Sequence, residues 1–137
     1  MKLKDCTYVS NPTEIDGVRV ENDIFQALNA VLDGEEVMRY ERGSSMEPIL
    51  HDGEYALLKP IESIDEVNVG DAVFCKVHNY LMTHMVVLKS YRHDKPYFLI
   101  GSSSYDLYGW TDKIYAKALS TNVIEIDEES LTKSVEV

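Results

Sequence analysis

A serine and a histidine stand at positions from which they could carry out acyl transfer together. Ser45 lies in the segment 43–53, which is too polar for a core strand and too short for an ordinary helix. A nucleophilic serine needs an exposed hydroxyl, a base within reach, and backbone N–H groups that point at the developing oxyanion. A tight turn after a strand can supply the first and third of these. The neutral imidazole of His84, with an ordinary pKa of about 6.5, could accept the serine proton.

The residues around Ser45 have the character of a stiff, open turn. Gly43 lets a substrate approach the backbone without a side chain in the way. Pro48 fixes its own φ angle and restricts the residue before it. Met46 and Leu50 are apolar, and we expect them either to anchor the turn from beneath or to line a specificity pocket.

Further short motifs follow this turn in a defined order. After the segment SMEPILHDGE, which starts at Ser45, they are VGDAVF (69–74), THMVV (83–87), GSSSYD (101–106) and IYAKA (114–118). The series resembles the serine peptidases of the signal-peptidase and LexA-like superfamily. In that family the first motif reads G-x-S-M-x-P-x-L-x-x-G-D/E and the second reads G-D-x-V-x-F. The resemblance covers about residues 36–120.

The resemblance implies roles for particular residues. Ser45 would be the nucleophile, and His84 would be the general base, at a position where relatives carry either lysine or histidine. Asp106 would orient the histidine, because the histidine-type enzymes have an aspartate in the fourth motif. The Ser45 N–H would form part of the oxyanion hole. The oxyanion and substrate-binding part of the site would further include Gly43, Ser44 and Met46.

The function expected from the resemblance is that of a soluble serine endopeptidase. Ser45 would be acylated by a peptide carbonyl, and water activated by His84 would release the second product, with small residues favoured beside the scissile bond. A second interpretation is a catalytically inactive, peptidase-like domain that binds a partner or associates with itself in regulation. The unusual fourth motif, in which serines 102–104 follow the glycine, and the acidic composition both motivate it.

The remaining histidines and the cysteines have simpler interpretations. His84 itself could be a half-buried strand residue, because its neighbours are apolar. His51 is close enough to Ser45 in sequence to line the site, whereas His78 and His93 fall in expected turns. The two cysteines, at positions 6 and 75, do not make a disulfide framework.

Composition excludes several classes of function. The 137 residues fit one domain, and 13 basic against 24 acidic residues give a net charge of −11. This charge disfavours nucleic-acid binding and attachment to an anionic membrane surface. No stretch approaches the roughly 20 apolar residues that span a bilayer, and no apolar run of signal-peptide type is present. We therefore expect a cytoplasmic protein with a polypeptide substrate, no metal, no cofactor, and self-association as an open alternative.

The elements that must position these residues are mostly strands. Asn22 or Asp23 caps a helix whose apolar residues follow helical spacing from Ile24 to Val31, and the Asp-Gly pair at 33–34 ends it. Strands are expected at 36–42, 54–58, 71–77, 80–91, 97–101 and 114–126. The fold class is therefore mainly β, a LexA/signal-peptidase-like domain with one N-terminal helix. We divide the chain into an extension with one helix (1–35), a catalytic β domain (36–126) and an acidic tail (127–137).

Overall fold

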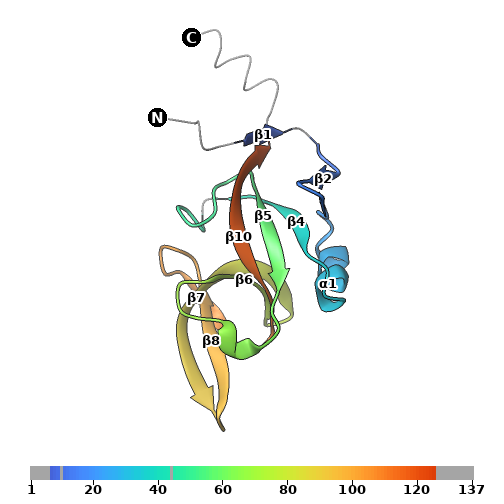
Figure 1. The fold of residues 1–137 in the computed structure, drawn as a ribbon. Coiled ribbons are helices and arrows are strands. Elements are labelled where there is room, and N and C mark those ends of the chain that lie inside the picture. The colour runs from blue at the N-terminus through green and yellow to red at the C-terminus, as the bar shows by residue number, and fades with distance from the viewer. Residues whose placement is uncertain (1–6, 10, 44, 126–137) are drawn as a thin grey trace.

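The structure, a computed structural model, describes residues 7–9, 11–43 and 45–125. Within these residues the fold is mainly β, with the α-helix α1 (Ile24–Leu32) and a 3-10 helix, η1 (Ile64–Glu66) (Figure 1). The strands are β1 (Thr7–Val9), β2 (Glu14–Ile15), β3 (Val18–Arg19), β4 (Val37–Glu41), β5 (Glu54–Pro60), β6 (Ala72–Val77), β7 (Tyr80–Arg92), β8 (Lys95–Gly101), β9 (Leu107–Thr111) and β10 (Ile114–Glu125). The expected class, a mainly β domain with one helix, is confirmed.

One large sheet dominates the fold. Its strands run in the order β4-β5-β10-β6-β7-β8-β9, and each neighbouring pair is antiparallel. β1 adds to β10 in parallel, and β2 pairs with β3 in a separate hairpin. β10, which comes last among the described strands, therefore lies in the middle of the sheet, between β5 and β6.

Two tight turns shape the β6–β7–β8 meander. His78 and Asn79 have φ angles of 48° and 69°, and His93 and Asp94 have φ angles of 52° and 64°. Positive φ at both central residues of a two-residue loop matches the right-handed twist of the flanking strands. The turns expected at these positions are therefore confirmed.

The sheet curls so that β9 returns towards β6. Lys76 links the two regions, because its carbonyl accepts the Thr111 hydroxyl at 2.6 Å and its N–H donates to the Lys113 carbonyl at 3.0 Å. Figure 1 shows β6 as the curved strand beneath β10. Phe98 and Ile100 are fully buried in the apolar cluster inside this curl.

The helix forms where the sequence predicts it. Asp23 caps α1, with Oδ1 accepting the N–H groups of Phe25 at 2.9 Å and Gln26 at 3.0 Å. Gly34 follows the helix with a φ of 83°, which suits glycine. The buried face of α1, represented by Ala27, packs into the same apolar cluster as the turn beside Ser45. The helix expected in an N-terminal extension thus shares its core with the β domain.

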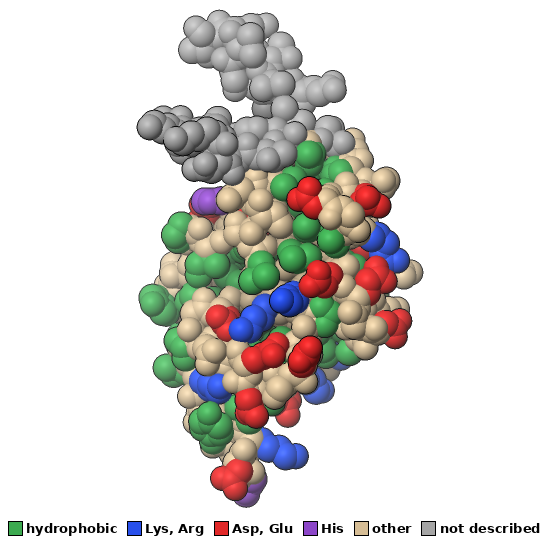
Figure 2. All heavy atoms as spheres, in the orientation of Figure 1, with side chains coloured by type: hydrophobic (Ala, Val, Ile, Leu, Met, Phe, Trp, Pro, Cys, Tyr) green, Lys and Arg blue, Asp and Glu red, His purple; other side chains and the backbone are tan. Residues whose placement is uncertain are grey.

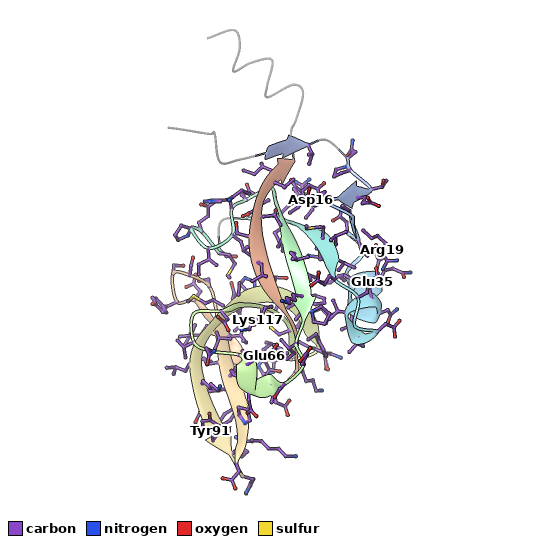
Figure 3. All side chains as sticks on the ribbon, viewed as in Figure 1. Asp16, Arg19, Glu35, Glu66, Tyr91 and Lys117 are labelled. Atoms are coloured by element: carbon purple, nitrogen blue, oxygen red, sulfur yellow. The ribbon has the colours of Figure 1, made fainter. Side chains whose placement is uncertain are left out.

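Some elements were not expected from the sequence. The strands predicted from the sequence begin at residue 36, yet the first twenty residues contain β1 and the β2–β3 hairpin, and β9 was also not predicted. Arg19 of this hairpin and Glu35, after α1, form an ion pair at 3.2 Å, and Figure 3 shows both on the same side of the molecule. The acidic tail, 127–137, lies outside the described residues.

The surface has the acidic character that the composition predicts. Figure 2 shows acidic side chains spread over the visible face, many of them on the side that carries α1. Among the described residues, no helix combines the length and apolar character needed to cross a lipid bilayer.

Candidate active site

Hydrogen bonds between its two ends close the loop that carries Ser45. This loop connects β4 to β5. The Gly43 N–H donates to Asp52 Oδ1 at 2.8 Å, and the Gly53 N–H donates to the Glu41 carbonyl at 2.8 Å. The chain therefore leaves the sheet and returns to it at neighbouring points.

A carboxylate within the loop braces its far side. Glu47 Oε1 accepts the Asp52 N–H at 3.0 Å, and Glu47 Oε2 lies 3.0 Å from His51 Nδ1. The Asp52 N–H, and then the His51 ring, lower the pKa of the Glu47 carboxyl, because both stabilise its charged form.

Met46 and Leu50 form the floor of the loop. Both side chains are buried in the cluster that includes α1, and the Leu50 N–H donates to the Met46 carbonyl at 2.9 Å. Both also line a cavity beside Ser45. Anchoring the turn and lining a pocket, which the sequence left as alternatives, are therefore both observed.

Glu54, just after the loop, is a fully buried carboxylate with several donors around it. It accepts the N–H groups of His51 at 2.8 Å, Thr121 at 3.0 Å and Asn122 at 2.9 Å, as well as the Ser120 hydroxyl. A buried charge is tolerated when hydrogen bonds satisfy it in this way. Glu54 thus ties the end of the loop to the irregular part of β10.

The loop and strand β7 bring Ser45 and His84 together. Ser45 Oγ lies 3.1 Å from His84 Nε2, although the two residues are 39 positions apart in the chain. This separation is within hydrogen-bond reach and suits proton transfer from the hydroxyl to the ring. The pairing expected from the sequence is present.

The surroundings of His84 keep its ring neutral and hold it by packing. Burial lowers the pKa of His84 below its ordinary value of 6.5, because the charged form loses solvation. The Tyr108 ring packs against it with centroids 4.4 Å apart and planes tilted by 51°. His84 Nδ1 is buried and has no hydrogen-bond partner among the described residues.

The hydrogen bond expected between Asp106 and His84 is absent. Asp106 is exposed, and its backbone, rather than its carboxylate, is tied to Ser102, through the Asp106 N–H at 3.0 Å and the Asp106 carbonyl at 2.8 Å. The prediction placed the Asp106 carboxylate at the His84 ring nitrogen that does not face Ser45. The turn at residues 102–106 instead directs its backbone inwards and leaves the Asp106 side chain in solvent.

The fourth motif instead contacts the Ser45 loop through Ser103, which was not predicted as a site residue. The Ser103 N–H and hydroxyl both donate to the Ser45 carbonyl, at 2.8 and 2.9 Å, and the hydroxyl also lies 2.5 Å from the Glu47 carbonyl. The only signal in the sequence was the run of three serines after a strand.

The other predicted site residues have mixed outcomes. Gly43 lines the cavity, but its N–H is engaged by Asp52, so it does not face an oxyanion. Ser44 lies outside the described residues. The role of the Ser45 N–H in an oxyanion hole stays a prediction. His51 lines the cavity, as weighed from its position in the sequence.

The cavity beside the Ser45–His84 pair has a volume of about 230 Å³. Besides the loop residues, Arg39, Glu41 and Thr83 line it. A larger hollow of about 430 Å³ lies near Trp110, but no hydroxyl among its described lining residues is hydrogen-bonded to a histidine.

Metal ligands and cysteine thiols are two other kinds of group that can support chemistry. The described residues contain no group of three or more potential metal ligands. Cys75 is buried in β6, and burial raises the pKa of its thiol to about 12, which makes it a poor nucleophile.

Comparisons with protein-family models, curated proteins and solved structures found no match to this chain.

Proposed function

We propose that the protein is a serine peptidase that uses Ser45 as nucleophile and His84 as general base. The observation that carries this proposal is the distance of 3.1 Å between Ser45 Oγ and His84 Nε2. The lowered pKa of His84 supports it, because the ring is then an unprotonated acceptor at neutral pH. The resemblance of the sequence motifs to signal-peptidase-like enzymes supports the choice of a peptide substrate.

The reaction would proceed through an acyl-enzyme. His84 Nε2 takes the Ser45 proton while Oγ forms a bond to the peptide carbonyl carbon, and the carbonyl oxygen becomes an oxyanion. The oxyanion collapses, the C–N bond breaks, and the imidazolium gives its proton to the leaving amine. Water, deprotonated by His84, then attacks the ester, and Ser45 leaves with the proton.

This arrangement is a dyad rather than a triad. Among the described residues, no carboxylate orients His84, whereas loss of the aspartate function in a classical triad lowers kcat by about 10⁴-fold. We therefore expect slow turnover, with ring orientation maintained by burial and by Tyr108.

The test is hydrolysis of a mixed peptide library, followed by mass spectrometry, together with acylation by a fluorophosphonate. The wild type and a matched control, Ser90→Ala in β7, should cleave, whereas Ser45→Ala and His84→Ala should not. Cleavage that persists in Ser45→Ala would contradict the proposal.

A non-catalytic peptide-binding domain is the second candidate. The unpartnered His84 Nδ1 and the solvent-facing Asp106 favour it. In that case the wild type would bind library peptides without cleaving any of them or reacting with the fluorophosphonate.

A further inference from the structure

Unpartnered polar atoms gather around the cavity beside Ser45. Among the described residues, the buried side-chain atoms without a hydrogen-bond partner of ordinary geometry are Arg39 Nε, Glu41 Oε1, Thr83 Oγ1 and His84 Nδ1. All four residues line this one cavity. Leaving a buried polar group unsatisfied costs about 1–3 kcal/mol, so such groups are rare unless a ligand or water completes them.

Arg39 and Glu41 share one face of the edge strand β4, because they are two positions apart. Arg39 Nη1 lies 3.5 Å from Glu41 Oε1, and their side chains are only 17% and 16% exposed. Burial raises the pKa of the Glu41 carboxyl, and the nearby Arg39 and Thr83 side chains only partly offset this. The two opposite charges make the cavity wall nearly neutral overall.

A third cation at the cavity does not change this balance. Arg42 also lines the cavity, but it is exposed, and its guanidinium lies over the Tyr40 ring, 5.1 Å from the centroid. Its charge is therefore screened by solvent.

We propose that this cavity binds the side-chain amide of an asparagine or glutamine next to the scissile bond of the peptide substrate. The inference rests on the proposed function, because it names the substrate of the same site. The amide NH₂ would donate to Glu41 Oε1 and Thr83 Oγ1, and the amide oxygen would accept from Arg39 Nε. Arg39, Glu41 and Thr83 interact with one another only through contacts that fall short of ordinary hydrogen-bond geometry. A neutral amide supplies both donors and an acceptor, so it could replace these contacts by hydrogen bonds of good geometry.

Other side chains complement the cavity less well. An aliphatic side chain would leave Arg39, Glu41 and Thr83 with only the long contacts that they make with one another. A lysine or a glutamate would bring a net charge into a cavity whose wall is nearly neutral, and part of the hydration of that charge would be lost without compensation. The volume of about 230 Å³ holds several waters at about 30 Å³ each, so a side chain of this length has room. This preference differs from the small residues that the family resemblance implies.

The test compares matched peptides that carry glutamine, asparagine, leucine, alanine, lysine or glutamate at each position beside the scissile bond. The wild type should cleave the glutamine or asparagine peptide at least about 10-fold faster in kcat/KM than the leucine peptide, since sites built to hydrogen-bond a substrate reject analogues that cannot do so. Thr83→Val keeps the side-chain shape. In this variant the ratio should fall below about 3-fold, because kcat/KM falls for the amide peptide and stays unchanged for the leucine peptide. Glu41→Gln is the second variant if Thr83→Val does not fold, and circular dichroism checks both.

A binding assay separates this inference from the proposed function. Ser45→Ala, titrated with the same fluorescently labelled peptides, should bind the amide peptide at least about 10-fold more tightly than the leucine peptide. Preference for amides in binding, with no hydrolysis by the wild type, would support the pocket and overturn the peptidase. Ser45-dependent cleavage with a preference for alanine or leucine would overturn the pocket and leave the peptidase standing. Absence of both binding and cleavage would overturn both.

Discussion

Ser45 and His84 are held in place by different forces. The loop around Ser45 is fixed by directional hydrogen bonds, which its N–H groups donate to the carboxylates of Asp52 and Glu54 and which its carbonyls accept from Ser103. The His84 side chain has one hydrogen bond, between Nε2 and the Ser45 hydroxyl. Its position otherwise depends on burial and on packing against the Tyr108 ring. The contrast teaches that polar contacts fix where the hydroxyl lies, whereas packing fixes the orientation of the imidazole.

The largest expected effect comes from removing the base. His84→Ala should lower kcat/KM by at least about 10³-fold, since catalytic serine and histidine act as a unit. Steady-state kinetics on a cleaved library peptide measure this, and His78→Ala, in the β6–β7 turn, is the matched control. Retention of more than about one tenth of wild-type activity in His84→Ala would remove histidine from the mechanism.

The hydrogen bonds that fix the Ser45 loop can be tested at Glu54. Glu54→Ala leaves several buried donors without an acceptor and should lower the free energy of unfolding by about 3 kcal/mol. Urea denaturation measures this loss, and Glu14→Ala, at an exposed position of β2, should change stability by less than about 0.5 kcal/mol. Equal stability of the two variants would show that Glu54 does not brace the loop.

Ser103 tests the hydrogen bonding of the same loop with a smaller change. Ser103→Ala removes the hydroxyl that donates to the Ser45 and Glu47 carbonyls but keeps its backbone bond. Loss of about 1–2 kcal/mol of positioning should lower kcat by about 10-fold with little change in KM. Ser104→Ala, in the same turn, controls for general loosening of this loop, and an equal loss of kcat there would contradict a specific role for Ser103.

The packing around His84 can be tested through the pH dependence of kcat/KM, and the effect expected here is the smallest. Because burial lowers the pKa of His84, the acidic limb of kcat/KM should have its midpoint below 6.5. Tyr108→Ala exposes the His84 ring to solvent, so the midpoint should rise towards 6.5. Proton NMR titration of His84 measures the same shift without turnover. A midpoint that does not move in Tyr108→Ala would mean that the tyrosine does not shield the ring.

The same lowered pKa affects stability. The unfolded chain binds the His84 proton more tightly than the folded chain does, so this residue destabilises the fold as pH falls below 6.5. Above that pH both states hold neutral histidine and the effect vanishes.

Local signals in the sequence predicted local structure well. The Asp23 cap and Gly34 bounded α1, and the turns at 78–79 and 93–94 gave the meander, because neighbouring residues decide such features. β1 was missed because β10, with which it pairs in the part of the chain that the structure describes, lies more than a hundred positions away. β9 was missed because Gly109 and mostly exposed side chains weaken its strand pattern.

The site was predictable only in part, for a related reason. The motifs paired Ser45 with His84, but they did not reveal which atoms of segment 101–106 would face the site. Ser103 reaches Ser45 across 58 positions through backbone and hydroxyl, and the turn that allows this directs Asp106 outwards. Such contacts depend on the orientation of a peptide plane, which residue types alone do not specify.

The central place of β10 has a consequence for how the two parts of the site are held together. Within the sheet, β10 lies between β5, which follows the Ser45 loop, and β6, which pairs with the strand that carries His84. A substitution that loosens residues 114–125 would therefore disturb the supports of both side chains at once, although it touches neither of them.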